Sequence, residues 1–312
     1  MALEIARERY SGSVNTVEIG ATAENGGTRD YVARIGGETT LPFLFGEGDE
    51  PNAPLIALEI FDREPTDWPD SLKREFGDAL KDPVRWAHRC VSDFGAKILC
   101  VRLMSAHPDW GAKPAQESVD FLKSLLQEVR VPVMVIGCGD AEKDNDLLAR
   151  ASQATKNERC LFGVATQSNY KTLTACCLAD GHSIIAESPI DVNIAKQVNI
   201  LISDMGFDSK RIVMHPTTAS LGYGMEYVFS IMERARLAAF SGDKMLSMPF
   251  VIFTGQEVWR VKEAKEHPAL GMKWEITTAI AMLHSGADLL VMRHPKAARE
   301  VKKFIDIAMR HT

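Results

Sequence analysis

The chain has 312 residues, of which 46% are hydrophobic and 25% are charged, and its formal net charge is −6. These values lie near the averages of soluble globular proteins and exclude a disordered chain, a collagen and a coiled coil. Duplex-binding domains carry a basic face, so the acidic balance argues against a nucleic-acid partner. The length fits either two domains or a single α/β barrel of about 250 residues with an extension.

The cysteines and the N-terminus indicate the compartment. No two of the six cysteines have C-x-x-C spacing, so we expect neither a zinc site nor an iron–sulfur cluster held by this chain alone. The first residues, MALEIARERY, contain no apolar signal segment, and no run reaches the about 18 apolar residues of a membrane-spanning helix. We therefore expect a cytoplasmic protein without membrane contact, its thiols buried in a reducing environment.

The first 53 residues differ in character from the rest. VNTVEIGA and RDYVARIGG are rich in strand-forming residues and flank Glu24–Gly27, whose Asn-Gly step is a strong hairpin signal. A Gly-, Glu-, Asp- and Pro-rich linker follows over residues 46–54. We predict that residues 1–53 form an N-terminal β-hairpin extension and linker, packed on the bottom or side of a main domain that comprises residues 54–312.

From residue 54 onward, short apolar runs alternate with stretches of helical periodicity. The runs are nearly continuously apolar, as parallel strands covered on both faces require. The predicted strands are LIALEIF (55–61), ILCVRLM (98–104), VPVMVIG (131–137), CLFGVAT (160–166), SIIAES (183–188), RIVMHP (211–216), PFVIFTG (249–255) and LLVMR (289–293).

The intervening segments are predicted to be helices. Val119, Leu122, Leu126 and Val129 share one helical face, and the same spacing recurs over 194–205 and 301–308. Helix-start prolines and helix-end glycines agree with this pattern, at Pro69, Pro114, Gly95, Gly206 and Gly286. Eight β-then-α units indicate a (β/α)8 TIM barrel, and the alternative is a doubly wound open sheet.

Several long strings resemble a known family. They are VNTVEIGATAENGGTRDYVARIGGETTLPF, DWPDSLKREFGDALKDPVRWAHRCVSDFGAKILCVRL, HPTTASLGYGMEYVFSIMERARLAAFSGDKML and MPFVIFTGQEVWRV. They are similar to the small subunit of the corrinoid iron–sulfur protein, a family that includes the delta subunit of acetyl-CoA decarbonylase/synthase. The resemblance extends over nearly the whole chain.

The resemblance implies a TIM-barrel subunit in an obligate heterodimer with a larger subunit, which carries the [4Fe–4S] cluster and most contacts to a cobamide. It implies that the heterodimer takes a methyl group from methyltetrahydrofolate through a methyltransferase. The methyl group then passes to acetyl-CoA synthase in the reductive acetyl-CoA pathway. On this interpretation the cobamide lies at the interface with the large subunit, no cluster is bound here, and activity of the chain alone stays open.

Polar residues gather after the predicted strands, where a barrel presents its ligand face. The stretch HPTTASLGYG offers hydroxyl groups and an open, glycine-rich backbone that suit the amide-edged ring of a corrin, although a long βα loop could have the same composition. The candidate cofactor-binding residues are Thr166, Asn169, His215, Thr217, Thr218, Ser220, Gly222, Tyr223, Gly224, Thr254 and Gln256.

Four charged residues lie inside predicted strands at similar heights, namely Glu59, Arg102, Glu187 and Arg293. Barrel closure would place Arg293, Glu59 and Arg102 on consecutive strands, so that inward-facing charges alternate in sign and compensate one another. Such a layer is either a structural salt-bridge layer or a floor for an anionic or amide-rich ligand.

No residue is assigned a catalytic or metal-binding role, and His107, His182 and His215 are interpreted as hydrogen-bonded rather than metal-bound. One alternative function is a pterin-binding TIM-barrel methyltransferase that acts on methyltetrahydrofolate itself, with Asp62, Asp140, Asn169 and Asp191 against the pterin. Another is a barrel that binds a phosphate ester. Only Gly255 could contribute to a phosphate cradle after the seventh predicted strand.

Overall fold

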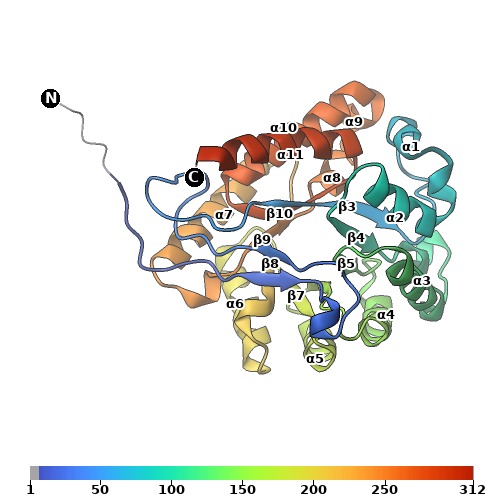
Figure 1. Ribbon diagram of the computed structural model, residues 1–312, viewed down its shortest axis with the longest axis horizontal. Coiled ribbons are helices and arrows are strands. Elements are labelled where there is room, and N and C mark those ends of the chain that lie inside the picture. The colour runs from blue at the N-terminus through green and yellow to red at the C-terminus, as the bar shows by residue number, and fades with distance from the viewer. Residues whose placement is uncertain (1–6, 312) are drawn as a thin grey trace.

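Eight parallel strands close into a barrel in the computed structural model, which describes residues 7–311 and only the backbone of Pro268 and His311 (Figure 1). The barrel strands are β3 (Leu55–Phe61), β4 (Ile98–Arg102), β5 (Val133–Ile136), β6 (Leu161–Ala165), β7 (Ser183–Glu187), β8 (Ile212–His215), β9 (Phe250–Ile252) and β10 (Ala287–Met292). Pairing of β10 with β3 completes the barrel. The (β/α)8 prediction is confirmed, and the open-sheet alternative is wrong.

Helices surround the barrel in chain order, as Figure 1 shows. They are α1 (Asp70–Phe76), α2 (Pro83–Ser92), α3 (Ala115–Glu128), α4 (Ala141–Ala154), α5 (Tyr170–Asp180), α6 (Val192–Asp204), α7 (Met225–Phe240), α8 (Thr254–Val258), α9 (Lys262–Glu266), α10 (Pro268–His284) and α11 (Pro295–Ala308). Short 3-10 helices are η1 (Ala23–Asn25), η2 (Gly77–Lys81), η3 (Met104–Ala106), η4 (Pro108–Trp110), η5 (Ser209–Arg211), η6 (Lys244–Leu246) and η7 (Met309–His311).

The predicted element ends needed small corrections. Pro69 and Pro114 are the N-cap residues of α1 and α3 rather than members of the first turn. The predicted strand 249–255 is too long, because Thr254 and Gly255 already belong to α8. Past the C-terminal end of α6, the predicted helix-end residue Gly206 has φ +83°. Glycine adopts this left-handed conformation without steric cost because it has no Cβ.

The apolar core has two layers, and this explains why the strands are apolar throughout. One layer fills the barrel and includes Ile98, Ile185 and Val251. The other lies between the strands and the surrounding helices, where Phe76 and Trp86 are fully buried. Alternate residues of each strand therefore face two different apolar environments.

The N-terminal extension closes the base of the barrel. Strands β1 (Val17–Ile19) and β2 (Ala33–Ile35) pair antiparallel, so the predicted hairpin is confirmed, and they cross in front of the barrel in Figure 1. The predicted tight Asn-Gly turn is wrong, since Asn25 ends η1 and Gly26 caps it with φ +80°. Val17, Ile19, Ala33 and Ile35 join the apolar layer inside the barrel, and the extension thereby plugs this end.

A buried ion triad holds the extension to the barrel. Arg236 of α7 lies 2.8 Å from Glu38 Oε1 and also contacts Asp288 of β10. Asp288 in turn accepts a hydrogen bond of 2.6 Å from the backbone N–H of Phe250. Arg236 is 1% exposed, so both carboxylates compensate a charge that is almost completely removed from water.

Candidate functional site at the mouth of the barrel

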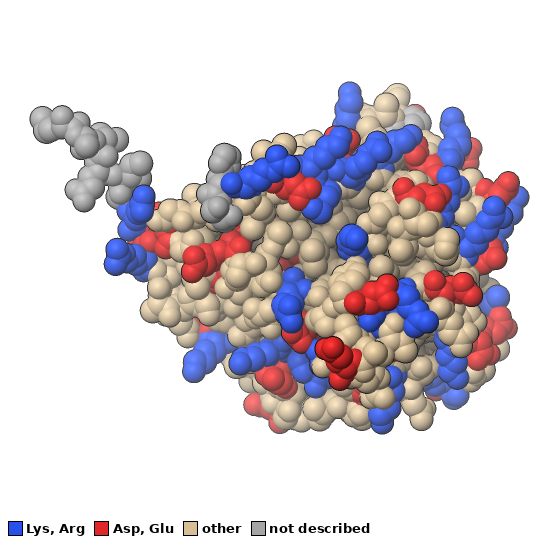
Figure 2. Space-filling view, viewed as in Figure 1, with Lys and Arg blue, Asp and Glu red and all other residues tan. Residues whose placement is uncertain are grey.

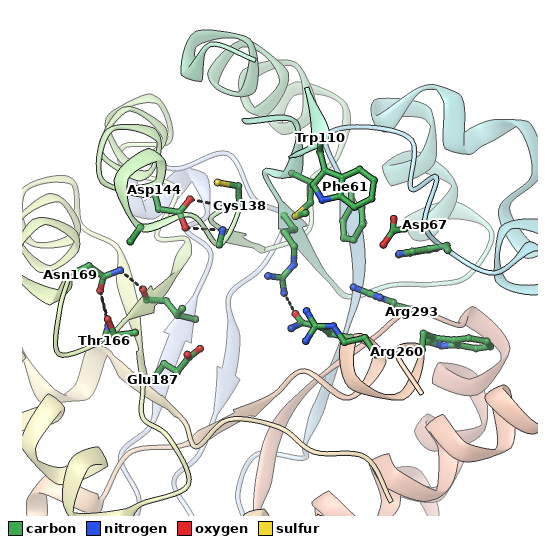
Figure 3. A pocket seen from close by; sticks show the side chains of 18 of the residues that line it. Phe61, Asp67, Trp110, Cys138, Asp144, Thr166, Asn169, Glu187, Arg260 and Arg293 are labelled. Atoms are coloured by element: carbon green, nitrogen blue, oxygen red, sulfur yellow. Dashed lines mark hydrogen bonds between the residues drawn. The ribbon is translucent and has the colours of Figure 1, made fainter. Parts of the chain in front are cut away.

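A cavity of about 580 Å³ opens at the carboxyl ends of the barrel strands (Figure 3). It lies at the end opposite the plug, where the βα loops of a TIM barrel form ligand sites. Its lining residues are Phe61, Asp67, Trp68, Pro69, Arg102, Met104, Trp110, Cys138, Gly139, Ala141, Asp144, Val164, Thr166, Ser168, Asn169, Glu187, Gln256, Trp259, Arg260, Lys265 and Arg293. The volume is typical of small-molecule and cofactor sites.

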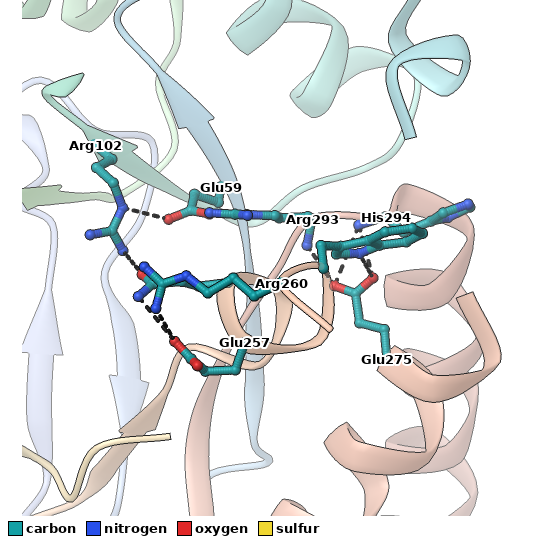
Figure 4. Close-up of polar contacts among 9 residues, drawn as sticks. Glu59, Arg102, Glu257, Arg260, Glu275, Arg293 and His294 are labelled. Atoms are coloured by element: carbon teal, nitrogen blue, oxygen red, sulfur yellow. Dashed lines mark hydrogen bonds and ion pairs between the residues drawn. The ribbon is translucent and has the colours of Figure 1, made fainter. Parts of the chain in front are cut away.

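An ion triad forms the floor of this cavity, as Figure 4 shows. Glu59 of β3 is fully buried, and its carboxylate oxygens lie 2.8 Å from Arg102 Nε and 2.5 Å from Arg293 Nε. The predicted alternation of Arg293, Glu59 and Arg102 is confirmed. Burial alone would raise the pKa of Glu59, but the two guanidinium groups outweigh it and hold the pKa below its usual value.

The fourth predicted charge, Glu187, lines the cavity but forms no hydrogen bond with the triad. Its carboxylate lies 3.8 Å from His215 Nε2 at the end of β8. Burial raises the pKa of Glu187, and Arg102 only partly offsets that rise. Glu187 is therefore a partly exposed acid at one wall of the cavity rather than a member of the floor.

Glu275 of α10 contacts two residues of the cavity lining from the side that faces away from the cavity. The sequence analysis did not predict it. It accepts hydrogen bonds from the backbone N–H of Arg293 at 2.7 Å and from the Trp259 indole at 2.8 Å. Burial raises the pKa of Glu275 to about 7. Because Arg293 and Trp259 both line the cavity, this single carboxylate positions two of its walls.

Three predicted site residues line the cavity, namely Thr166, Asn169 and Gln256. Asn169 Oδ1 accepts from the backbone N–H of Thr166 at 2.7 Å, and Asn169 Nδ2 donates to the Val164 carbonyl at 3.2 Å. Gln256 Oε1 accepts from Arg102 Nη2 at 2.6 Å. These neutral polar groups are thus held in place by contacts of their own.

His215 lies deeper, beside an adjoining space of about 80 Å³ that Glu187 and Gln256 also line. Its Nδ1 is 3.1 Å from the Val251 carbonyl, and its ring meets Phe253 edge-on. Burial lowers the pKa of His215 to about 4, so the imidazole is neutral at physiological pH.

The other predicted residues do not line the cavity. Thr217 donates to the Ser188 carbonyl at 2.7 Å, and the Thr218 hydroxyl accepts from the Phe253 backbone at 3.0 Å. Tyr223 is half-exposed and donates to Glu263 at 2.6 Å. The remaining residues of this group are Ser220, which is buried, Gly222 and Gly224, which have φ +79° and +98°, and Thr254, which is fully buried.

Several cavity residues came from segments without a recognisable motif. Trp110 belongs to a 3-10 helix after β4, and Arg260 and Lys265 come from the α8–α9 region. Asp144 accepts backbone N–H groups of Cys138 and Gly139 at 2.7 and 3.0 Å. No periodic pattern marks such residues, because only the folded loops bring them to the mouth.

Within residues 7–311, no three His, Cys, Asp or Glu side chains lie close enough together to hold a metal ion. Among the helices of the same residues, none combines the length and apolar character needed to cross a membrane.

Comparison with known proteins then identifies the family. The sequence profile of the CO dehydrogenase/acetyl-CoA synthase delta subunit matches residues 16–305. The chain belongs to this family. A subunit delta of the acetyl-CoA decarbonylase/synthase complex from Methanopyrus kandleri is 35% identical over 305 residues, which cover 95% of this chain and 75% of the relative. The corresponding subunit from Archaeoglobus fulgidus is 34% identical, with coverage of 95% and 69%.

Solved structures of dihydropteroate synthases share the fold of this chain. The 7,8-dihydropteroate synthase from Vibrio fischeri superimposes with a TM-score of 0.62 at 9% identity, over 88% of this chain and 99% of that one. The Xanthomonas albilineans enzyme in complex with 7,8-dihydropteroate gives 0.56 at 12% identity, over 87% and 99%. At such identities the likeness concerns the TIM barrel alone.

Proposed function

We propose that this chain covers and positions a cobamide methyl carrier at the mouth of its barrel. A larger partner subunit with an iron–sulfur cluster would hold most of the cobamide. The methyl group would come from methyltetrahydrofolate through a methyltransferase and pass to acetyl-CoA synthase. Family membership supports the assignment to this complex, and the polar, aromatic-walled cavity at the mouth carries the proposal for this chain.

The residues at the mouth fit the edge of a corrin ring. Its substituents are uncharged amides, which need hydrogen-bond donors and acceptors rather than charges. Thr166, Ser168, Asn169 and Gln256 supply neutral polar groups along the cavity wall. The cofactor supplies a cobalt that accepts and releases a methyl group.

The chain's own contribution is to exclude water and hold its walls in place. Phe61, Trp110 and Trp259 place aromatic surface around the cavity, and Glu275 holds Trp259 through the indole N–H. Reduced cobalt is a strong nucleophile that is sensitive to oxidants, so a dry cover protects it. His215 is neutral and Glu59 is fully paired, which supports an accessory subunit rather than an acid–base catalyst.

The shared fold favours one second candidate, a methyltransferase that binds the pterin of methyltetrahydrofolate itself. The Xanthomonas albilineans enzyme, which shares the fold, was solved in complex with 7,8-dihydropteroate. Here, however, the carboxylates of Asp140 and Asp191 already accept hydrogen bonds from backbone N–H groups in the first turns of α4 and α6. Asp62 is bonded to Ser105 and Ser118, and Asn169 to its own loop. Calorimetry of the chain with methyltetrahydrofolate separates the candidates, since micromolar binding would favour the methyltransferase.

The main test measures cobalt in the complex of this chain with its large subunit. Ser168 is an exposed residue of the cavity wall, so Ser168→Trp adds bulk at the mouth without disturbing the core. Ser230, exposed on the outer helix α7, gives the matched control Ser230→Trp. We expect Ser168→Trp to lower cobalt content after gel filtration and the control to keep it. Full cobalt and normal methyl transfer in both variants would place the cobamide elsewhere.

A further inference from the structure

We propose that the mouth cavity contains a second binding site, which takes an aromatic molecule carrying an oxyanion, with Arg293 as its anchor. The oxyanion is a carboxylate or a phosphate, because a guanidinium group binds both through the same paired N–H donors. The proposal concerns a ligand of this chain alone and does not depend on the cobamide.

Arg293 is a buried cation with unused donors. It is 7% exposed, and its Nε is bonded to Glu59 at 2.5 Å. Neither terminal nitrogen of Arg293 has a hydrogen-bond acceptor among residues 7–311. Figure 3 shows the side chain extending toward the centre of the cavity. Neither of these nitrogens is among the fully buried unpartnered atoms of the described residues, so both are open to the cavity, where a ligand oxyanion would replace water as the acceptor.

The floor also has an excess of positive charge. One carboxylate, Glu59, serves both Arg102 and Arg293. A guanidinium group does not lose its proton in proteins, so this excess cannot be removed by titration. Lys265 lines the same cavity and adds an exposed cationic group, whereas Arg260 is paired with Glu257 at 2.9 Å. Glu187 and Glu275 compensate the two arginines in part through space, and an incoming anion would add to that compensation by direct contact.

The acidic residues of the cavity do not compensate Arg293 in this way. Asp144 already accepts from Cys138 and Gly139. Glu187 lies beside His215, and Asp67 is exposed to water. Figure 3 shows Asp144 and Glu187 on the opposite side of the cavity from Arg293. Of these three acids, only the exposed Asp67 lies on the side of Arg293 in Figure 3, and we call this the cationic side of the cavity.

Aromatic surface surrounds this cationic side and defines the rest of the ligand. The Arg293 guanidinium lies 5.4 Å from the ring centre of Phe61 and 5.0 Å from that of Trp68. The indole N–H of Trp68 is buried without an acceptor among the described residues. Trp110 and Trp259 complete the aromatic lining. Phe61 and Trp68 are 3% exposed and Trp259 is 2% exposed, so a flat ring would stack on the half-buried Trp110 while its oxyanion reaches Arg293.

The first experiment titrates the full-length chain with three ligands that share one ring: 2-naphthoate, 2-naphthyl phosphate and neutral 2-naphthamide. Calorimetry gives affinities, and tryptophan fluorescence reports binding beside the cavity. We expect the two anions to bind about tenfold more tightly than the amide, because a charge-assisted hydrogen bond to Arg293 contributes about this much to affinity. The stronger of the two anions identifies the preferred oxyanion. Equal affinity for all three ligands, or no binding, would overturn the proposal.

The second experiment uses variants. Arg293→Lys keeps the charge but removes the paired donors, so it should abolish the preference for the anions. Lys265→Met removes a charge that is exposed to solvent, so it should weaken anion binding only about twofold to threefold. Lys262→Met, on the same helix but outside the lining, is its matched control. Denaturant midpoints confirm folding, and an unchanged preference in folded Arg293→Lys would contradict the proposal. Cobalt retention by the complex is measured separately, so this site and the cobamide proposal fail independently.

Discussion

The two ends of the barrel bury ion triads of opposite composition. At the mouth, one carboxylate, Glu59, lies between two guanidinium groups. At the base, one guanidinium group, Arg236, lies between the carboxylates of Glu38 and Asp288. Both triads are largely removed from water, yet one lines a cavity and the other is sealed beneath the N-terminal extension.

The two triads differ in whether a change of protonation can neutralise their excess charge. Burial raises the pKa of Asp288 well above its ordinary value, although Arg236 opposes the rise. The base can therefore hold a proton and become neutral. The arginines at the mouth cannot become neutral in this way, because a guanidinium group keeps its proton in proteins. The same kind of buried cluster thus suits a permanent seal at one end and ligand binding at the other.

The largest effect is expected from removal of the central cation at the base. Arg236→Met leaves two carboxylates facing each other in the sealed end and should cost about 3–5 kcal/mol of unfolding free energy. Urea denaturation measures the loss. Arg34→Met is the control, because Arg34 forms an exposed pair with Glu18 at 3.1 Å, and such pairs are worth less than about 1 kcal/mol. Similar losses in both variants would show that the base triad is not structural.

Removal of the central anion at the mouth should cost somewhat less. Glu59→Gln leaves Arg102 and Arg293 without their shared carboxylate, at a cost of about 3 kcal/mol. Both arginines retain aromatic contacts and border the cavity, so water and Gln256 relieve part of the penalty. The same urea experiment applies, with Glu18→Gln as the control, because the carboxylate of Glu18 also lies between two arginines, Arg34 and Arg159, but is partly exposed to water. If Glu59→Gln had the same urea midpoint as the wild type, the two arginines at the mouth would not need a carboxylate partner for stability.

The two triads should also give opposite pH dependence. The pKa of Glu59 is lowered by its two arginines, so its contribution to stability is present above the unfolded pKa of about 4.3 and lost as pH falls. The pKa of Asp288 is raised by burial, so its contribution is present at low pH and lost as pH rises above about 3.9. Glu59→Gln should flatten the acid side of the stability profile and Asp288→Asn the alkaline side. Profiles that change on the same side would refute the comparison.

The smallest effect is expected in the loop after β8. Gly222 has φ +79°, and an added Cβ would come no closer than 3.9 Å to Trp274. Gly222→Val should therefore cost only the backbone strain of about 1–2 kcal/mol. In the complex we expect Gly222→Val to reduce cobalt retention more than Thr217→Ala, which should reduce it only a few-fold. Full retention in both variants would remove this loop from the cobamide site.

The sequence alone determined the architecture of the barrel. Near-continuous apolar strands such as 98–104 alternate with helices of regular spacing, and this pattern needs no tertiary information because each segment's period reflects its own geometry. It also placed Glu59, Arg102 and Arg293 on consecutive strands, since the order of a closed parallel barrel follows the chain.

Only the tertiary structure decided what surrounds the site. Trp110, Arg260, Lys265 and Asp144 reach the cavity from loops and short helices, whose conformations depend on distant contacts rather than on a local period. The same holds for Glu275, which α10, the helix directly before the last barrel strand, directs at the backbone of Arg293. Conversely, the hydroxyl groups of Thr217 and Thr218 suggested a ligand in sequence but bond to the protein itself, because a folded loop satisfies its own polar groups first.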